Sequence, residues 1–202
     1  MKSKMKIQKK RKGRGMKKGS NYERKICKRL SLWWTDNERD DIFWRTSGSG
    51  ARATQRSKKK KSTYGQYGDV QAIDPIGEPL IKLLTIEIKC GYSKNTFADL
   101  IETSQNPKVK TGVFQKFIEQ AEQSCEEAHS YSWLIISKRN GREPIVIMPY
   151  YFYKRLKCYF NIHAKLTFAN SDDIQSVFIT TLDELLDISP DVFEELYKRK
   201  CC

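Results

Sequence analysis

Two short segments that alternate polar and apolar residues, 68–74 and 83–89, constrain the fold of this chain more than any other feature. In the second segment, apolar residues at positions 84, 86 and 88 alternate with a threonine, Glu87 and Lys89. Successive side chains of a strand point to opposite faces, so one face is apolar and the other carries a carboxylate and an amine. The pattern predicts a strand that packs one face on a core and presents charge on the other.

The residues between these segments predict that the two strands form a hairpin. Residues 75–79, Pro-Ile-Gly-Glu-Pro, are rich in turn formers. In a hairpin folded about residues 77–79, Asp69 lies roughly opposite Glu87, and opposed Cβ atoms are about 4.5–5.5 Å apart. A slip of one residue would break this pairing. Two carboxylates at that distance, with Lys89 beside them, could hold a divalent metal ion against a phosphodiester.

A purely structural role for the same residues stays open at this point. A glutamate and a lysine on the polar face of a half-buried strand are common, and a motif as short as Glu-x-Lys occurs by chance in many proteins. The Gly-Asp-Val strand that precedes it at hairpin spacing favours the functional interpretation.

The net charge of +14 is concentrated in two segments. Residues 1–18 contain ten Lys or Arg and no acid, and residues 51–61 contain six more and no acid. Outside them, the basic residues that remain of the 38 nearly balance the 24 acidic ones. Such segments bind phosphate backbones without sequence preference. A solvated tail or an address signal explains residues 1–18 equally well, whereas the internal segment lies directly before Asp69.

Length and composition favour one domain in a reducing compartment. A chain of 202 residues is long enough to bury a core. Its apolar runs are far shorter than the ~18 residues needed to cross a bilayer, and the Lys-rich N-terminus lacks the apolar segment of a secretory signal. The six cysteines include no C-x-x-C pair, so we expect neither disulfides nor zinc.

Helix and strand patterns interleave after a basic tail, residues 1–18, that we expect to be disordered. The expected elements are a helix over 20–34, strands over 41–46, 68–74 and 83–89, a helix over 113–129, strands over 132–137 and 144–148 joined through Asn-Gly, a helix over 150–156, strands near 164–169 and 176–180, and a helix near 190–199. This order predicts an α/β fold with a mixed sheet flanked by helices. We assign residues 19–149 to the core domain and residues 150–202 to a C-terminal extension packed on it.

Glu23 lies near the start of the first expected helix and allows two interpretations. Residues 20–23 fit a capping box, with Ser20 at the N-cap and Glu23 at N3. Glu23 also borders the apolar stripe of the helix, from which it could face the sheet and reach a metal-bound water.

The order of these motifs resembles that of the PD-(D/E)xK nuclease superfamily. It comprises a helix with a glutamate, a strand that ends in Arg-Thr-Ser-Gly-Ser at residues 45–49, the Gly-Asp strand, the Glu-Ile-Lys strand, a helix and a strand. Within the superfamily the chain is most similar to Holliday junction resolvases of the archaeal type and their phage-encoded relatives. The resemblance covers about residues 19–149 and implies a restriction-endonuclease-like fold and magnesium-dependent hydrolysis of DNA. The basic insertion, the tail and the residues after about 150 depart from the pattern and leave the substrate geometry open.

The resemblance also implies roles for individual residues. Asp69, Glu87 and Lys89 match the catalytic set, with Glu23 as a fourth member. Asp69, Glu87 and the carbonyl of Ile88 would bind one or two Mg²⁺ ions, for which Mn²⁺ would substitute. Lys89 would orient the attacking water and counter charge on the phosphate, and Glu23 would position water or a second metal ion.

A further set of residues would contact DNA, mainly through phosphates. The set comprises Arg24, Arg45, Ser47 or Ser49, Arg52, Arg56, Lys58, Lys59, Lys60, Lys61 and Gln120. Gln120 matches a glutamine on the helix that follows the Glu-Ile-Lys strand, and Gln115 competes for the same position.

We therefore expect a magnesium-dependent endodeoxyribonuclease that acts on branched DNA in recombination or repair. Cutting two strands of a junction in concert requires a symmetric homodimer. We expect it in the cytoplasm with the nucleoid, or in the host cytoplasm if phage-encoded, with no membrane partner. The alternatives are a restriction- or repair-type nuclease on linear or flapped DNA, and a non-catalytic nucleic-acid-binding protein of the same fold. His129 and His163 are too scattered for a histidine-based site.

Overall fold

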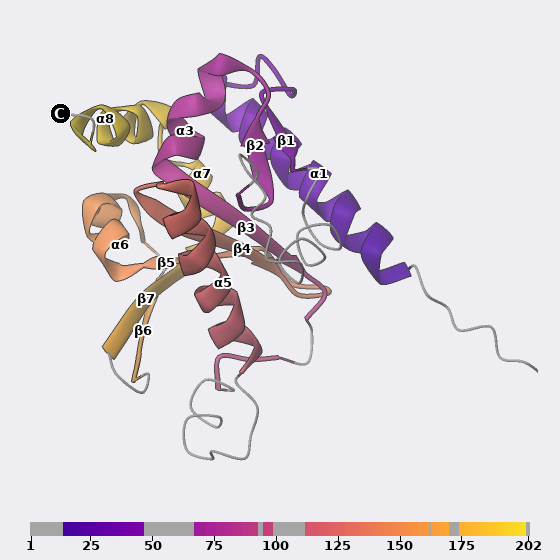
Figure 1. The fold of residues 1–202 in the computed structure, drawn as a ribbon, viewed down its shortest axis with the longest axis vertical. Coiled ribbons are helices and arrows are strands. Elements are labelled where there is room, and N and C mark those ends of the chain that lie inside the picture. Colours follow the sequence, from indigo (N-terminus) through magenta and orange to yellow (C-terminus); the bar gives the residue numbers. More distant parts are fainter. Residues whose placement is uncertain are drawn as a thin grey trace, which may run out of the picture.

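A mixed five-stranded sheet forms the centre of the molecule in the computed structural model, which describes residues 14–46, 67–92, 95–98, 112–161, 163–169 and 174–200. The strand order is β3–β4–β5–β7–β6 (Figure 1). β3 and β4 are parallel, and the other three pairs are antiparallel. The strands are β3 (Leu84–Cys90), β4 (Ser132–Lys138), β5 (Ile145–Pro149), β6 (Ala164–Ala169) and β7 (Ile174–Thr181). The predicted mixed sheet is confirmed.

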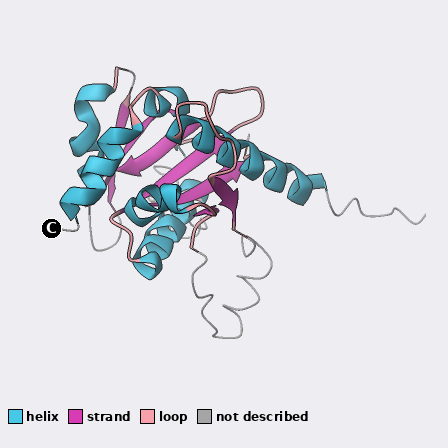
Figure 2. Cartoon of the chain, turned by 90° about the horizontal axis from the view of Figure 1, so that it is seen from above, coloured by secondary structure: helices cyan, strands magenta, loops and turns pink. Residues whose placement is uncertain are grey.

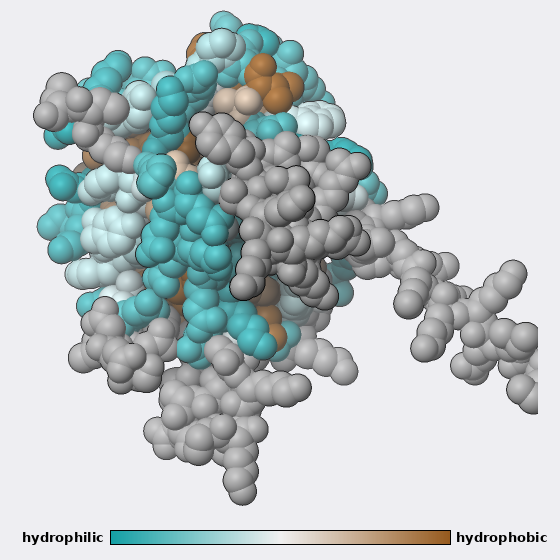
Figure 3. Space-filling view, in the orientation of Figure 1, coloured by the Kyte–Doolittle hydropathy of each residue, from teal (hydrophilic) through white to brown (hydrophobic). Residues whose placement is uncertain are grey.

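Helices cover both faces of this sheet (Figure 2). On one face, the apolar side of α5 (Val113–Ala128) packs against Trp133, Ile135 and Ile147, and its outer side is hydrophilic (Figure 3). The helices on the opposite face are α1 (Arg14–Trp34), α3 (Glu78–Leu83), α6 (Tyr150–Leu156), α7 (Leu182–Leu186) and α8 (Pro190–Lys200). A 3₁₀ helix, η2 (Lys157–Tyr159), follows α6. Within the described ranges, no helix is both long and apolar enough to cross a membrane.

The predicted hairpin between the Asp69 segment and β3 is wrong. β2 (Val70–Ala72) pairs antiparallel with β1 (Phe43–Arg45), and a 3₁₀ helix, η1 (Pro75–Gly77), lies with α3 between β2 and β3. Asp74 caps η1 by accepting a hydrogen bond from the backbone N–H of Ile76 (3.1 Å). Pro75 takes the first helical position, where the N–H that it lacks would have no partner. The Pro/Gly cluster therefore starts helical structure instead of closing a turn.

The first helix begins earlier than predicted. Because α1 starts at Arg14, Ser20 lies inside the helix and the predicted capping box at Ser20 and Glu23 is wrong. The N-cap position precedes the first helical residue, where backbone N–H groups lack partners. Residues 14–18 of the predicted disordered tail are thus helical, and residues 1–13 lie outside the described part of the chain.

The segment after residue 150 belongs to the sheet and is not an extension packed on a finished core. β7 pairs with β5, and β6 pairs with β7. Phe178 of β7 is buried in the same core as Leu134 of β4. Trp33 of α1 meets Phe193 of α8 edge-on, with ring centroids 5.2 Å apart. One core therefore joins the first and last helices.

Two glycines have the same left-handed backbone conformation in different surroundings. Gly141 lies in the turn between β4 and β5, as the Asn-Gly signal predicted, with φ +67°, and an added Cβ would meet no described atom within 4 Å. Gly68 has φ +66°, and an added Cβ would lie 2.7 Å from the carbonyl oxygen of Ile86 and 3.0 Å from Cγ2 of Thr85. Glycine at position 68 therefore allows the chain before Asp69 to approach β3 closely.

We expect Gly68→Ala to destabilise the protein more than Gly141→Ala. Both substitutions place a side chain at positive φ, which costs about 1–2 kcal/mol. At position 68 the methyl group also overlaps β3, which adds about 1–3 kcal/mol. Urea unfolding of the two variants measures the difference, and equal losses would show that residue 68 does not approach β3 this closely.

Candidate active site

Asp69 closes the open edge of β3 with two hydrogen bonds. Its backbone N–H donates to the carbonyl oxygen of Ile86 (2.8 Å), and its Oδ2 accepts from the backbone N–H of Ile88 (2.7 Å). On its other side, the N–H of Thr46 donates to the carbonyl of Asp69 (3.1 Å), and Thr46 Oγ1 donates to the carbonyl of Gly68 (2.9 Å). The β1–β2 ribbon thus meets the main sheet at Asp69, which brings Asp69 to β3 without the predicted hairpin.

The side chains of Glu87 and Lys89 extend from β3 toward α5. Lys89 Nζ lies 2.7 Å from Glu87 Oε2, and the Glu87 residue is 2% exposed. Gln120 Nε2 donates to the same Oε2 (2.8 Å), and Ser124 Oγ donates to Oε1 (3.1 Å). Gln120 Oε1 also accepts from Lys89 Nζ (3.0 Å). Three donors therefore hold the Glu87 carboxylate, and Gln120 bridges it to the ammonium.

Of the two candidate glutamines, Gln120 is placed between Glu87 and Lys89. Gln115 lies five positions earlier, about 140° away around the helix. Ser124 follows Gln120 by one turn and shares its face of α5. Ser124 was not predicted, because its four-residue spacing from Gln120 was the one available signal and serine is common on helix surfaces.

Two carboxylates are buried beside each other at this point. Burial, followed by the Glu87 carboxylate, raises the pKa of Asp69 to about 7, while Lys89 and the hydrogen bond from the Ile88 N–H oppose the shift. Asp69 is 8% exposed. Like charges in a region of low dielectric constant disfavour joint ionisation. A dication between them would relieve that repulsion.

The donor atoms fit an ion that prefers oxygen ligands. Asp69 and Glu87 supply carboxylates, and the carbonyl of Ile88 faces the same edge as its N–H, because both groups of a residue point to one side of a strand. Among the described residues, no three His, Cys, Asp or Glu side chains gather into a metal cluster. Mg²⁺ usually keeps several waters and binds through one or two carboxylates, which fits the donors at this edge of β3.

Glu23 and Arg45 approach Asp69 from the α1 side. Arg45 Nε of β1 lies 2.7 Å from Glu23 Oε2 of α1, and the two side chains are mostly buried. Glu23 adds to the forces that raise the pKa of Asp69. Burial raises the pKa of Cys27 to about 12, with Glu23 and Asp69 adding to the shift and Arg45 opposing it. These groups therefore share one electrostatic neighbourhood.

Other predicted residues lie elsewhere. Arg24 is exposed, and its Nη1 donates to Asn21 of the same helix (3.0 Å). Adjacent helix positions point about 100° apart, so Arg24 does not share the direction of Glu23. His129 is the C-cap of α5 with φ 53°, and His163 packs against aromatic rings, so each has a place in the fold apart from the candidate site. The predicted loop residues lie outside the described ranges: Ser47, Ser49, Arg52, Arg56, Lys58, Lys59, Lys60 and Lys61.

We expect Asp69→Asn to stabilise the metal-free protein at alkaline pH. Between about pH 4 and 7 the unfolded state releases the Asp69 proton while the folded state keeps it, so stability falls as pH rises and stays low above pH 7. The penalty at pH 8 is up to about 4 kcal/mol, and asparagine removes it while its side-chain oxygen can still accept from Ile88.

Urea unfolding in EDTA measures this effect as the difference between variant and wild type at pH 8 and at pH 4. The gain should shrink toward pH 4, close to the unfolded-state pKa of 3.8, because protonation of the unfolded chain there brings its charge at Asp69 closer to that of the folded state. A variant that is less stable than wild type by the same amount at both pH values would contradict the assignment of repulsion at Asp69.

The chain matches the family described as "Phage putative PDDEXK endonuclease" over residues 14–195. This span begins at the start of α1 and ends within α8, so it includes all four predicted catalytic residues and both C-terminal strands. No curated protein and no solved structure matches the chain. Because the family match covers most of the sequence, the protein belongs to the phage PD-(D/E)xK endonuclease family.

Proposed function

We propose that this nuclease cuts branched DNA, such as a Holliday junction, with Mg²⁺ bound at the edge of β3. The observation that carries the proposal is the meeting of Asp69 with β3, the strand that bears Glu87 and Lys89, although β2, η1 and α3 separate Asp69 from that strand in the sequence. Such a meeting provides two oxygen ligands and a cation within reach of a single phosphate.

The metal ligands in this proposal are the carboxylates of Asp69 and Glu87 and the carbonyl of Ile88. They would hold one or two Mg²⁺ ions, with Mn²⁺ as a substitute. The bound metal would supply an activated water and neutralise charge on the phosphate. Because the carboxylates must be ionised to bind, the raised pKa of Asp69 makes binding tighten as the pH rises through 7.

We propose that Lys89 acts on the scissile phosphate. Its ammonium contacts Glu87 and Gln120 and lies 5.5 Å from the centroid of the Phe117 ring. At the scissile group the ammonium would counter the charge that builds on the phosphate oxygens and orient the water. Gln120 would keep the carboxylate and the ammonium at their spacing.

Glu23 and Arg45 form the α1 side of the proposed site. Glu23 would position water or a second metal ion, and Arg45 would hold a phosphate next to the one being cut. Their ion pair keeps both side chains ordered before DNA binds. Arg24 and the basic residues of the loop, Arg52, Arg56, Lys58, Lys59, Lys60 and Lys61, would contact phosphates farther along the duplex.

Branched DNA is proposed as the substrate because the order of motifs resembles that of junction resolvases. The net charge of +14 suits the high phosphate density where helices meet. Two symmetry-related strands are cut in a junction, so we propose that the active form is a homodimer. The proposed place of action is the host cytoplasm.

We expect Lys89→Ala to lower the cleavage rate at least 10²–10³-fold while DNA binding changes little, since one charge-stabilising donor carries about that much of a rate enhancement. Cleavage of a labelled synthetic junction and gel-shift binding measure the two effects. Lys116→Ala is the matched control, because Lys116 is an exposed lysine on α5. Near-normal cleavage by Lys89→Ala would overturn the catalytic assignment.

We expect a four-way junction to be cut faster than a flap or a linear duplex of the same sequence, in Mg²⁺ and not in EDTA. Paired, symmetric cuts on the junction would support a resolvase that acts as a dimer. Preference for the flap or the linear duplex would instead identify a repair- or restriction-type nuclease. Binding of DNA without cleavage in Mg²⁺ or in Mn²⁺ would show that the fold is used for nucleic-acid binding alone.

A further inference from the structure

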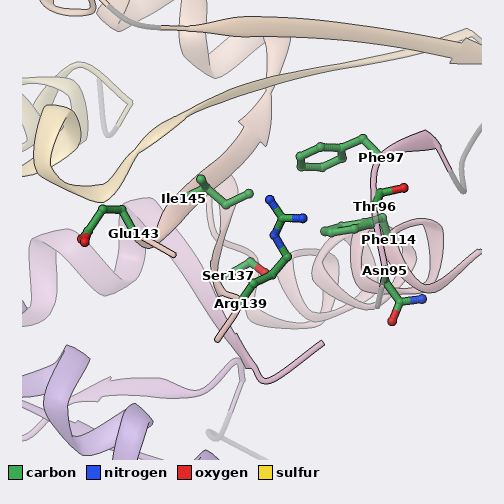
Figure 4. Close-up of a pocket in the computed structure, with 8 residues that line it drawn as sticks. All are labelled: Asn95, Thr96, Phe97, Phe114, Ser137, Arg139, Glu143 and Ile145. Atoms are coloured by element: carbon green, nitrogen blue, oxygen red, sulfur yellow. The ribbon is translucent and has the colours of Figure 1, made fainter. Parts of the chain in front are cut away.

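A small pocket opens at the carboxyl end of β4, next to the proposed site (Figure 4). Ser137 lies in its wall and is the register partner of Lys89 in the parallel β3–β4 pair, so the two side chains share one face of the sheet. The pocket volume is about 180 Å³. Sites for drug-sized ligands measure about 300–1,000 Å³, so this pocket suits a single planar ring system.

The walls of the pocket combine aromatic rings with the guanidinium of Arg139 and the carboxylate of Glu143. The rings of Phe97 and Phe114 pack with centroids 4.5 Å apart and planes at 31°. Figure 4 shows the guanidinium of Arg139 between Ile145 on one side and the two rings on the other. No acid in the described part of the chain forms an ion pair with Arg139. The polar groups beside Phe97 come from Asn95 and Thr96.

A row of aromatic rings connects this pocket to Lys89. The Lys89 ammonium lies 5.5 Å from the centroid of Phe117. Phe117 meets Phe114 at a centroid distance of 5.8 Å, and Phe114 forms the pocket wall with Phe97. A DNA strand with one phosphate at Lys89 would therefore bring a neighbouring nucleotide to the mouth of the pocket.

We infer that this pocket binds one unpaired nucleobase of the strand that is cut. Aromatic faces stack with bases regardless of sequence, and a guanidinium can stack on a base or donate to its carbonyl and ring-nitrogen acceptors. A paired and stacked base would first have to leave the duplex, which costs a few kcal/mol. The inference rests on the proposed function and specifies it further, because it makes an unpaired nucleotide beside the cut the feature that the enzyme reads.

The test compares two labelled single strands in EDTA by fluorescence anisotropy: a short thymidine oligomer and the same backbone with abasic sugars. Wild type should bind the oligomer with bases roughly tenfold more tightly, as expected for stacking of one base. Arg139→Ala and Phe97→Ala should bring the ratio of the two affinities close to one. Arg142→Ala, which removes the same charge from the same hairpin outside the pocket, should weaken both and keep the ratio.

Two results would overturn the inference: a wild-type ratio near one, or equal weakening of both oligomers by Arg139→Ala, which would make Arg139 a phosphate contact. Thermal unfolding of each variant confirms that it is folded, and Arg139→Ala tests the pocket even if Phe97→Ala is unstable. Because no step here requires cleavage, failure of the nuclease assay would leave this result standing, and a ratio near one would leave the nuclease proposal standing.

Discussion

The bridge from Asp69 to the edge of β3 is the constraint on which the rest of the structure depends. An edge strand presents N–H and C=O groups that need partners, and Asp69 satisfies two of them, one with its backbone and one with its carboxylate. Gly68 permits the close approach and Thr46 fixes the other side. The position of the carboxylate is therefore set by backbone hydrogen bonds, which are stiffer than a long side chain.

This arrangement buries the carboxylates of Asp69 and Glu87 beside each other. Hydrogen bonds from neighbouring groups offset much of the free-energy cost of burying them. Lys89, Gln120 and Ser124 donate to Glu87, while the Ile88 N–H donates to Asp69. The raised pKa of Asp69 shows that the compensation is incomplete. Under the proposed function, this residual repulsion would hold the two carboxylates ready for a cation at the expense of stability.

The sequence predicted structural elements correctly where the signal lies within a few neighbouring residues. The alternation in β3 and the Asn-Gly turn before β5 predicted those elements correctly. The contact between Asp69 and Glu87 was expected from a hairpin, but the partner of β2 is β1, with Arg45 opposite Val70. The sequence between residues 45 and 70 contains no local signal that would predict the pairing of β1 with β2. Asp74 followed by Pro75 is a local signal for the start of a helix, but residues 75–79 were predicted to form a turn. The contacts of Ser124 and the Glu23–Arg45 pair depend on tertiary packing and have no such local signal.

The parallel pairing of β3 and β4 brings Lys89 and the aromatic pocket to the same end of the sheet. Parallel strands end at the same edge of a sheet, so Lys89 on β3 and Ser137 on β4 lie side by side on the face under α5. The helix that connects the two strands must then cross that face, which is how Gln120 and Ser124 come to hold Glu87. An antiparallel β4 would send the Arg139 hairpin to the opposite end of the sheet, away from Lys89. The β3–α5–β4 unit thus brings together the amine of Lys89, to which we assign a catalytic role, and the aromatic pocket, and the β1–β2 ribbon adds the carboxylate of Asp69 from the open edge.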